Sequence, residues 1–569
     1  MALNPSSQAN SAVDVIDGTV SEFYNLVDQC IRKSEVMPGQ YKSITSPSYS
    51  NNCPIDESSF TTVDVGCPAP QVVDIENSFI TAVVEVPISF PADTFKGTTD
   101  AITFFVGWRS SLDILQRYII YCNHKVVYDQ VYVGEESFIL QSLIPEHVRC
   151  RKPNQYTTYD NASSFSPDVC GTYITLKGGA DAALAATTVN VKIPIKLDIN
   201  QFLLFQNFKY LPGFCGTWSI KLYPSTQNMI ICQVNPEKLL TVTDLSHIAA
   251  GSALNDYDHC FVQLGDTFRC LTDLTYTPAI AAHDEEPEVP TASTGPTFAN
   301  VAGITAGRAK VHEVLYHQTQ FELMYDVYDG LKARYMARPL TIPVNKLDYG
   351  RFAGAMKNSG SSSTYTAAVS NVESIFILPF TDDNHHTVCF NPEFKEFYLS
   401  ISGFGNFPQQ PFNTFGNDEK HNRFVNLTLD ALNVNNSPIM APNKDLLNSL
   451  ETKKIQSYTV TTAGAHNDTN APITPDYISV DHDNSNFLIG IPFSNDIDFQ
   501  GGLTSNGNIN IKLASNSSII DTLANNLRGG TTGCGIGATV MFCTDAALMI
   551  KVIPYSDQPE CRLVTERIV

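Results

Sequence analysis

The stretch IPIKLDINQFLLFQNFKYLPGFCGTWSIKL at residues 193–222 is echoed by IPFSNDIDFQGGLTSNGNINIKL at residues 491–513. Each stretch begins with an Ile-Pro-apolar step, continues through a Phe-Gln pair and a glycine-bearing turn, and ends in Ile-Lys-Leu. The separation is far longer than the roughly 20–50 residues of a solenoid repeat, so the echo predicts one β domain used twice in a single chain. Chance similarity is the alternative, since β-strand sequences are built from a small set of residue types. A duplicated β domain favours a structural building block over a catalyst.

Length and composition agree with a folded protein of several domains. A chain of 569 residues is too long for one core and is expected to hold two to four domains. Hydrophobic residues make up 43% and charged residues only 17%, against roughly 25% charged in an average soluble domain. The surface is therefore either rich in uncharged polar residues or largely buried against partners.

The charge balance argues against direct nucleic-acid binding. The formal net charge is -22, and the first 40 residues carry only Arg32 and Lys33 among several acidic residues. Strong binding to nucleic acid needs clustered Lys and Arg that release counterions from phosphates. We therefore expect no direct, sequence-specific nucleic-acid binding.

The 14 cysteines are scattered and form no CxxC pair, so a zinc ribbon or finger has no support. Cys122 and Cys543 lie within strand-like runs and are expected to be buried thiols. A local bridge between Cys53 and Cys67 is possible in principle but is not expected. Scattered, buried thiols of this kind are typical of a protein in a reducing compartment.

The sequence shows neither a secretory signal nor an apolar run of the ~18 residues that a membrane span needs, so we expect synthesis in the cytosol and a soluble protein.

The N-terminal region, residues 1–69, is predicted to be an arm with one short helix. Thr19 and Glu22 form a capping-box signature. Apolar residues then recur at helical spacing until Pro38: Val20, Phe23, Val27, Cys30 and Ile31. Two interpretations remain open for this helix. It is either a small surface helix or an arm that packs under its own or a neighbouring subunit.

From residue 70 onward the apolar period changes to two, which predicts strands. The run FITAVVEVPISF places Ile80, Ala82, Val84, Val86 and Ile88 on one face. About eight strands are expected over 70–236, with Asn123-His124 as a tight turn, and this spacing is typical of an all-β sandwich. The expected strands include the runs at 101–108, 118–133, 138–144 and 201–211.

Residues 237–310 are predicted to be a linker or exposed loop, because 283–303 is rich in Pro, Thr and acidic residues. A second β unit is predicted over 311–569. Its strands are expected at 311–328, 334–344, 373–380, 423–434 and 540–554, among others. The run SSIIDTLANNLRGG at 517–530 is predicted to be a short helix closed by Gly529.

No motif for catalysis or metal binding is complete. His385 and His386 sit at a strand connection and are interpreted as a hairpin tip. The run that starts at Asp481 resembles a calcium loop but has Asn486 where glycine is needed and Pro492 where glutamate is needed. The glycines at 530–537 and 178–186 lack the spacing of a phosphate or dinucleotide loop. We therefore nominate no catalytic, cofactor-binding or metal-binding residue, and no cofactor.

The order of motifs resembles the double jelly-roll major capsid proteins of the lineage that includes adenovirus hexon, virophages and the Maverick or Polinton elements. The resemblance is carried by VKIPIKLDINQFLLFQNFKYLPGFCGTWSIKLYPSTQNM in the first unit, and by ESIFILPF, FPQQPFNTFGND, NLTLDALNV, the echo at 491–513 and IKVIPYSDQP in the second. It covers roughly residues 70–560 through short motifs.

This resemblance implies an all-β chain of two tandem eight-stranded jelly rolls, with short helices in the N-terminal segment and loops. It implies a structural, non-enzymatic protein of the virion that forms pseudo-hexagonal homotrimers tiling an icosahedral shell. The implied partners are the chain itself, neighbouring trimers, and penton or minor capsid proteins, with assembly inside the host cell. Outward towers would have to fit within 237–310 and 435–485 and would be modest. No substantial C-terminal extension is expected beyond the last strand.

Two other classes of protein remain as alternatives. The first is a β-sandwich carbohydrate-binding protein or glycoside hydrolase, against which stand the missing signal peptide and the presence of only two tryptophans, Trp108 and Trp218. The second is a single-jelly-roll capsid protein with a protruding domain. It requires residues 310–560 to lack a second jelly roll, which the echo contradicts. Pro194 and Pro492 are expected to be structural residues at strand starts or edges, because proline cannot donate to a sheet ladder.

Overall fold

The structure is a computed structural model. The residues that it describes are 23–28, 40–45, 60–90, 101–142, 155, 170–177, 186–226, 228–234, 261–263, 305–351, 366–380, 394, 396–401, 405–414, 419–432, 453–457, 476–480, 487–493, 503–514, 537–553 and 559–564. Strands dominate this part of the chain, and every ladder between the described strands is antiparallel. The predicted all-β fold class is confirmed. None of the described helices is long and apolar enough to cross a membrane.

The first β unit is built around the long strand β3 (Gln71–Phe90). One flank of β3 pairs with β14 (Lys310–Glu322), which in turn pairs with β1 (Gln40–Thr45). The other flank pairs first with β9 (Tyr210–Pro212) and then with β8 (Thr187–Asp198). The five apolar residues of β3 that the sequence placed on one face are all buried, so the period-two prediction is confirmed.

Two four-stranded sheets complete the first unit. One has the order β2-β10-β5-β6 and the other has the order β12-β11-β4-β7. Their bounds are β2 Thr61–Val65, β4 Ala101–Gly107, β5 Leu115–Cys122, β6 Lys125–Val131, β7 Gly171–Lys177, β10 Trp218–Pro224, β11 Ile230–Val234 and β12 Phe261–Gln263. The predicted turn between β5 and β6 is confirmed: Asn123 and His124 both have positive φ (48° and 65°), as a two-residue hairpin turn requires.

The second β unit contains an eight-stranded sheet in which β16 (Thr366–Phe380) changes partners along its length. The first part of β16 pairs with β22, and the later part pairs with β23 on one flank and β21 on the other. β22 continues to β17 and β18, while β23 continues to β15 and β24. The bounds are β15 Leu340–Arg351, β17 Glu396–Ile401, β18 Gly405–Phe412, β21 Ile489–Pro492, β22 Leu503–Ala514, β23 Gly537–Lys551 and β24 Glu560–Val564.

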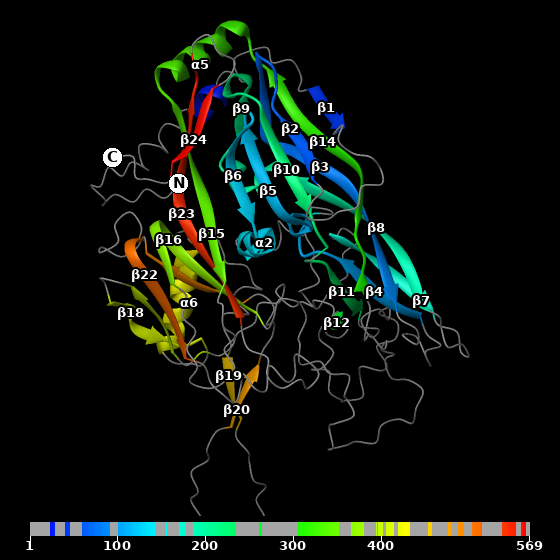
Figure 1. Cartoon of the computed structure of the whole chain (residues 1–569), viewed down its shortest axis with the longest axis vertical. Coiled ribbons are helices and arrows are strands. Elements are labelled where there is room, and N and C mark those ends of the chain that lie inside the picture. The colour runs from blue at the N-terminus through cyan, green and yellow to red at the C-terminus, as the bar shows by residue number, and fades with distance from the viewer. Residues whose placement is uncertain are drawn as a thin grey trace, which may run out of the picture.

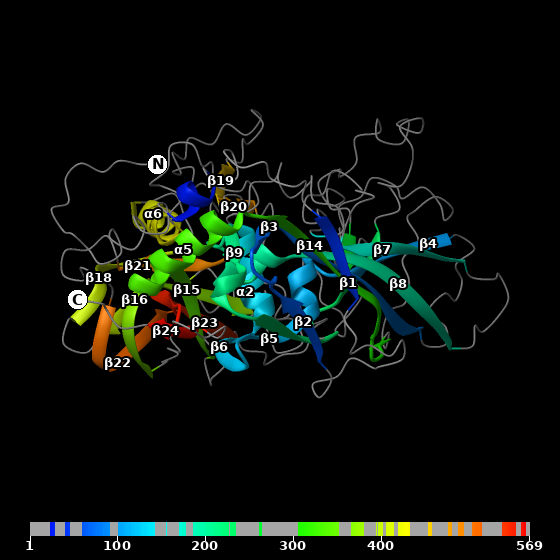
Figure 2. The same ribbon diagram turned by 90° about the horizontal axis from the view of Figure 1, so that it is seen from above.

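The two units lie side by side and share one hydrophobic core. Both views place β15, β16, β22 and β23 on one side of the molecule and β3, β8 and β14 on the other (Figures 1 and 2). Helix α5 (Tyr325–Ala337) follows β14 and leads into β15, so it carries the chain from the first unit to the second. A separate ribbon of β19 (Lys453–Ser457) and β20 (Asp476–Val480) extends from the opposite end of the molecule in Figure 1.

The Ile-Pro steps of the two echoed segments lie on comparable strands of the two units. Pro194 lies in β8, which pairs with the long strand β3, and Pro492 ends β21, which pairs with the long strand β16. The Ile-Lys-Leu ends lie in different surroundings: β10 pairs with β2 and β5 in a separate sheet from β3, whereas β22 pairs with β17 and with the long strand β16 itself. Among the described ladders, β8 and β21 each have one partner strand, so both prolines lie on edge strands, where a missing N–H donor is tolerated.

Strand β14, which lies within the predicted second unit, pairs with β3 of the first unit. Its ladder to β3 joins segments about 240 residues apart, and no local pattern encodes such a pairing. Strands β1 and β2, which lie within the predicted arm, likewise pair with strands of the first unit.

Several predicted strands are wrong, because short apolar runs do not distinguish a strand from a buried helix. Residues 138–144 fall largely in α2 (Val133–Ser142), and residues 423–434 fall in α6 (Glu419–Ala431). The run at 201–211 forms short 3-10 turns before β9, and the runs at 311–328 and 334–344 are interrupted by α5. The predicted helix at 517–530 lies outside the described residues.

A buried carboxyl group lies within the core of the first unit. Glu136 on α2 is fully buried, and its Oε1 accepts a hydrogen bond from the hydroxyl of Tyr118 on β5 at 2.8 Å. Burial raises the pKa of Glu136 from an ordinary value of 4.5 to about 8, although the Tyr118 hydrogen bond opposes this shift. The group is therefore neutral in the folded protein at pH 7. It serves as a hydrogen-bonded part of the core.

We predict that Glu136 makes the protein less stable as the pH rises from about 4.5 to about 8. The unfolded chain releases this proton near pH 4.5 and the folded chain holds it until about pH 8, so the stability present at low pH is lost across this window. The full loss is on the order of 4–5 kcal/mol. Glu136→Gln keeps an acceptor for Tyr118 and removes the titration, so its unfolding free energy should fall less over the window than that of the wild type.

The measurement is denaturant unfolding at a series of pH values, with the exposed Glu322→Gln as the control. The control should follow the wild-type profile. Parallel profiles for the wild type and Glu136→Gln would contradict the prediction.

Candidate interaction surfaces

The described residues contain no group of three or more His, Cys, Asp or Glu side chains that could hold a metal ion. The incomplete metal-binding and phosphate-loop motifs of the sequence lie almost wholly outside the described residues. They are His385 and His386, the run from Asp481, and the glycines at 178–186 and 530–537. Since Glu136 is fully buried, it does not line an open cleft.

The N-terminal segment docks on its own chain. Residues 23–28 are helical, and Phe23 and Val27 are completely buried. The ring of Phe23 meets the ring of Tyr335 on α5 edge-on at 5.2 Å. The hydroxyl of Tyr24 donates to the backbone oxygen of Asn207 at 2.7 Å. Of the two interpretations left open for this helix, the structure agrees with an arm that packs under its own subunit.

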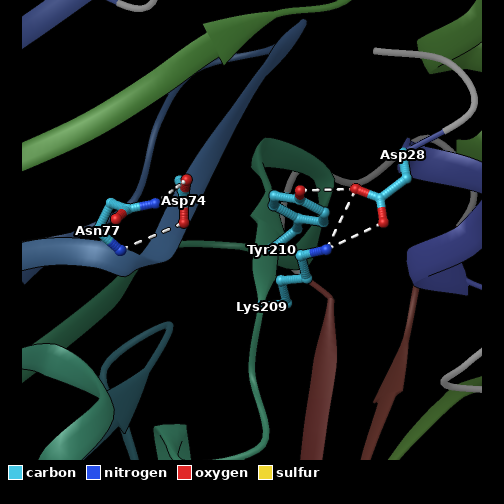
Figure 3. A network of polar contacts seen from close by, with 5 residues as sticks. All are labelled: Asp28, Asp74, Asn77, Lys209 and Tyr210. Carbon is cyan, nitrogen blue, oxygen red and sulfur yellow. Dashed lines mark hydrogen bonds and ion pairs between the residues drawn. The ribbon is translucent and has the colours of Figure 1, made fainter. Parts of the chain in front are cut away.

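A polar clasp closes the same contact (Figure 3). The carboxylate of Asp28 accepts hydrogen bonds from Nζ of Lys209 at 2.9 Å and from the hydroxyl of Tyr210 at 2.7 Å. Because the Asp28 and Lys209 side chains are both partly exposed, solvent screens their ion pair and its contribution is about 1 kcal/mol or less. The clasp fixes the position of the segment, while burial of Phe23 and Val27 supplies most of the stabilisation.

Near this clasp, β3 changes partner from β9 to β8. Its ladder with β14 has a register shift between Asp74 and Phe79, which leaves a bulge. The side chain of Asp74 accepts from the backbone N–H of Asn77 and, at 2.8 Å, from its side-chain amide, as Figure 3 shows. The hydroxyl of Ser78 accepts from the backbone N–H of Thr319 on β14. These side chains replace the missing ladder bonds, so the long strand bends without leaving its polar groups unpaired.

The seam between the two units runs along β6, β15 and β24. The ring of Tyr132 after β6 meets the ring of Tyr349 on β15 at 4.3 Å. The side-chain amide of Asn207 donates to the backbone oxygen of Pro343 on β15 at 2.9 Å. Tyr128 on β6, whose hydroxyl donates to the backbone oxygen of Asn345 at 3.4 Å, is almost completely buried there. The two units are therefore packed directly on each other.

The turn between β5 and β6 binds the chain just before β24. The amide nitrogen of the Asn123 side chain donates to the backbone oxygen of Pro559 at 2.8 Å. Its amide oxygen accepts from the backbone N–H of Thr217 at 3.0 Å. Directly beside this turn, Sγ of Cys122 lies 2.7 Å from Sγ of Cys561 on β24. The expectation of buried thiols is confirmed for Cys122, while Cys543 is only partly buried.

Six large apolar side chains are exposed among the described residues. They are Phe60, Val126, Met324, Tyr325, Tyr349 and Ile553. Met324 and Tyr325 are adjacent at the start of α5 and are 55% and 66% exposed. Phe60 is partly covered by Tyr223 and by the ammonium group of Lys221. Single exposed apolar residues are normal on a soluble protein, so they do not define an interface by themselves.

The sequence carries little signal for these contacts. Cys122 and Cys561 are 439 positions apart, and no spacing rule relates them. Helix α6 was recoverable in principle, because His421, Phe424 and Thr428 are buried at intervals of three and four residues. The run at 138–144 offered no such period, since α2 also buries the polar residues Glu135, Glu136 and Ser137.

No protein-family model and no curated protein matches the sequence. Solved structures with a similar course of the chain include one of the Sputnik virophage by cryo-EM, with 11% identity, 94% of this chain and 90% of that chain covered, and a TM-score of 0.45. The crystal structure of the mavirus major capsid protein shows 11% identity, coverage of 92% and 90%, and a TM-score of 0.44. The Faustovirus major capsid protein shows 9% identity, coverage of 94% and 98%, and a TM-score of 0.38.

We predict that Gly216 is required where the units meet. Its φ is +90°, and a Cβ atom there would lie 2.8 Å from Oδ1 of Asn123 and 2.8 Å from Cγ of Pro559. Gly216→Ala should therefore destabilise the protein by at least about 1 kcal/mol, both through backbone strain and through displacement of the Asn123–Pro559 contact.

Gly330→Ala is the matched control, because Gly330 lies within helix α5 and a Cβ atom there would meet nothing within 4 Å. Alanine should stabilise that position by up to about 1 kcal/mol. Thermal unfolding of the two variants and the wild type should thus give midpoints on opposite sides of the wild-type value. A Gly216→Ala protein as stable as the wild type would show that the seam tolerates a side chain here.

Proposed function

We propose that this chain is a structural capsid protein, a double jelly roll that forms homotrimers with a pseudo-hexagonal outline and tiles an icosahedral viral or virus-like shell. The observation that carries the proposal is the pair of antiparallel β units joined side by side in one chain, each with an Ile-Pro step on a strand that pairs with the long strand of its unit. Three such chains around one axis set six similar units in a ring, so threefold symmetry yields an approximately sixfold outline. Trimers with such an outline can pack edge to edge into a continuous layer.

The surface composition supports an assembling subunit. With only 17% charged residues, the chain can bury large areas against copies of itself at a small desolvation cost. The net charge of -22 without a basic arm suits a shell protein that leaves neutralisation of a genome to other molecules. The proposed partners are therefore the same chain in its trimer, neighbouring trimers, and penton or minor capsid proteins. The proposed location is the virion, after synthesis and assembly inside the host cell.

The alternative of a carbohydrate-binding protein or glycoside hydrolase meets a specific objection. Sugar-binding grooves use exposed aromatic rings for stacking, and tryptophan is the usual choice. Both tryptophans of this chain are buried, Trp108 at 0% and Trp218 at 1% exposure. Trp218 also donates its ring N–H to the backbone oxygen of Cys215 at 3.0 Å and packs against Phe205. Neither ring can stack on a sugar without unfolding part of the core. The proposed role includes no catalytic step.

The test is to express the full chain alone and to measure its mass in solution by size exclusion with light scattering. A trimer of three 62.5 kDa chains, about 190 kDa, or a closed shell, is the expected result. Tryptophan emission should be that of buried indoles and should not change when oligosaccharides are added. A stable monomer whose tryptophan emission responds to a glycan would overturn the proposal in favour of the alternative.

A further inference from the structure

Two cysteines that are 439 positions apart in the sequence meet at the seam between the two β units. Cys122 is the last residue of β5 in the first unit, and Cys561 lies on β24, which pairs with β23 of the second unit. Their sulfur atoms are 2.7 Å apart, about 0.7 Å more than a disulfide bond length. A small movement of either side chain would therefore bring the two sulfurs to bonding distance.

The surrounding backbone holds both cysteines in place. The residue after Cys122 is Asn123, whose side chain donates to the backbone oxygen of Pro559, two residues before Cys561. On the other side, the ladder of β24 with β23 sets Cys561 opposite Ile550. Contacts on both strands thus hold the backbone around the two thiols in place.

We propose that Cys122 and Cys561 form a redox-sensitive staple, a disulfide that covalently joins the first unit to the C-terminal strand of the second. The staple is open in a reducing compartment and closes when the protein meets a low-molecular-weight disulfide such as oxidised glutathione. This inference rests on the seam alone and stands whether or not the chain is a capsid subunit.

The unequal burial of the two thiols sets the order of the reaction. Cys561 is partly exposed, whereas Cys122 is 2% exposed, and its hydrogen bond to Cys561 together with burial raises the pKa of the Cys122 thiol. The thiolate of Cys561 therefore attacks the small disulfide first, forming a mixed disulfide and expelling one small thiolate. Cys122 then loses its proton and attacks the sulfur of Cys561, expelling the second small thiolate. Two protein thiols are oxidised and one small disulfide is reduced to two small thiols, which take up the two protons.

Closure should stabilise the chain, because the bond would tie together residues that are 439 positions apart and so restrict the unfolded state strongly. It should also stop β24 from separating from β6 and the turn after Cys122. We expect the thermal midpoint to rise by several degrees, on the order of 3–6 °C, on oxidation.

The first test uses the wild-type chain, purified under reducing conditions and then incubated with oxidised glutathione. After thiol blocking and proteolysis, mass spectrometry should find the peptide of Cys122 joined to the peptide of Cys561. Reduction should abolish this joined peptide. Its absence from oxidised, folded protein, or a bond from Cys122 to the neighbouring Cys215 in its place, would overturn the proposal.

The second test uses variants. Cys561→Ser, or Cys561→Ala if the hydroxyl is poorly tolerated, should lose the oxidation-dependent rise in thermal midpoint. Cys122→Ser should instead accumulate one glutathione on Cys561, because the second step is blocked. Cys543→Ser is the matched control, since Cys543 is also partly buried and lies on a strand of the second unit, and it should behave as the wild type. An unchanged rise in the Cys561 variants would show that other cysteines cause the stabilisation.

Discussion

The pairing of β14 with β3 is the contact on which the rest of the architecture depends. It brings the middle of the chain back to the longest strand of the first unit, about 240 residues upstream, and leaves β3 bonded along both flanks. Because β14 ends at this sheet, α5 begins beside it and delivers the chain to β15 in the second unit. The N-terminal helix then uses α5 and β9 as its docking surface, through Tyr335 and Tyr210. The position of the second unit relative to the first therefore depends on this one ladder.

The seam between the units combines apolar packing with a few directed polar bonds. Tyr128, Tyr132 and Asn207 make contacts to backbone or ring atoms of β15, and Asn123 holds the chain before β24. Directed bonds of this kind favour a single docking geometry over many similar ones. A fixed relation between two units is what a subunit needs if several copies are to meet in a regular array. The same seam places Cys122 against Cys561, so its strength can respond to redox conditions.

Some local patterns in the sequence predicted local structure correctly. Alternation identified β3, and the positive φ values of Asn123 and His124 bear out the turn expected from two residues that tolerate such angles. The Ile-Pro steps of both echoed segments lie on edge strands, where proline is permitted. Structure that depends on contacts with distant segments of the chain could not be predicted from the sequence. Residues 138–144 and 201–211 are apolar enough for a strand, yet they fall largely in a helix and in short 3-10 turns. The assignment of β14 and the Cys122–Cys561 contact depend on pairings across hundreds of residues.

The most direct measurement of the central claim is electron cryo-microscopy of the isolated assembled protein, averaged without imposed symmetry. If each chain contributes two β units at a fixed seam, particles viewed down the axis should show six lobes of density that obey threefold symmetry, with two unequal lobes for each chain. Particles with three lobes, or with two lobes per chain whose separation varies from particle to particle, would contradict the account.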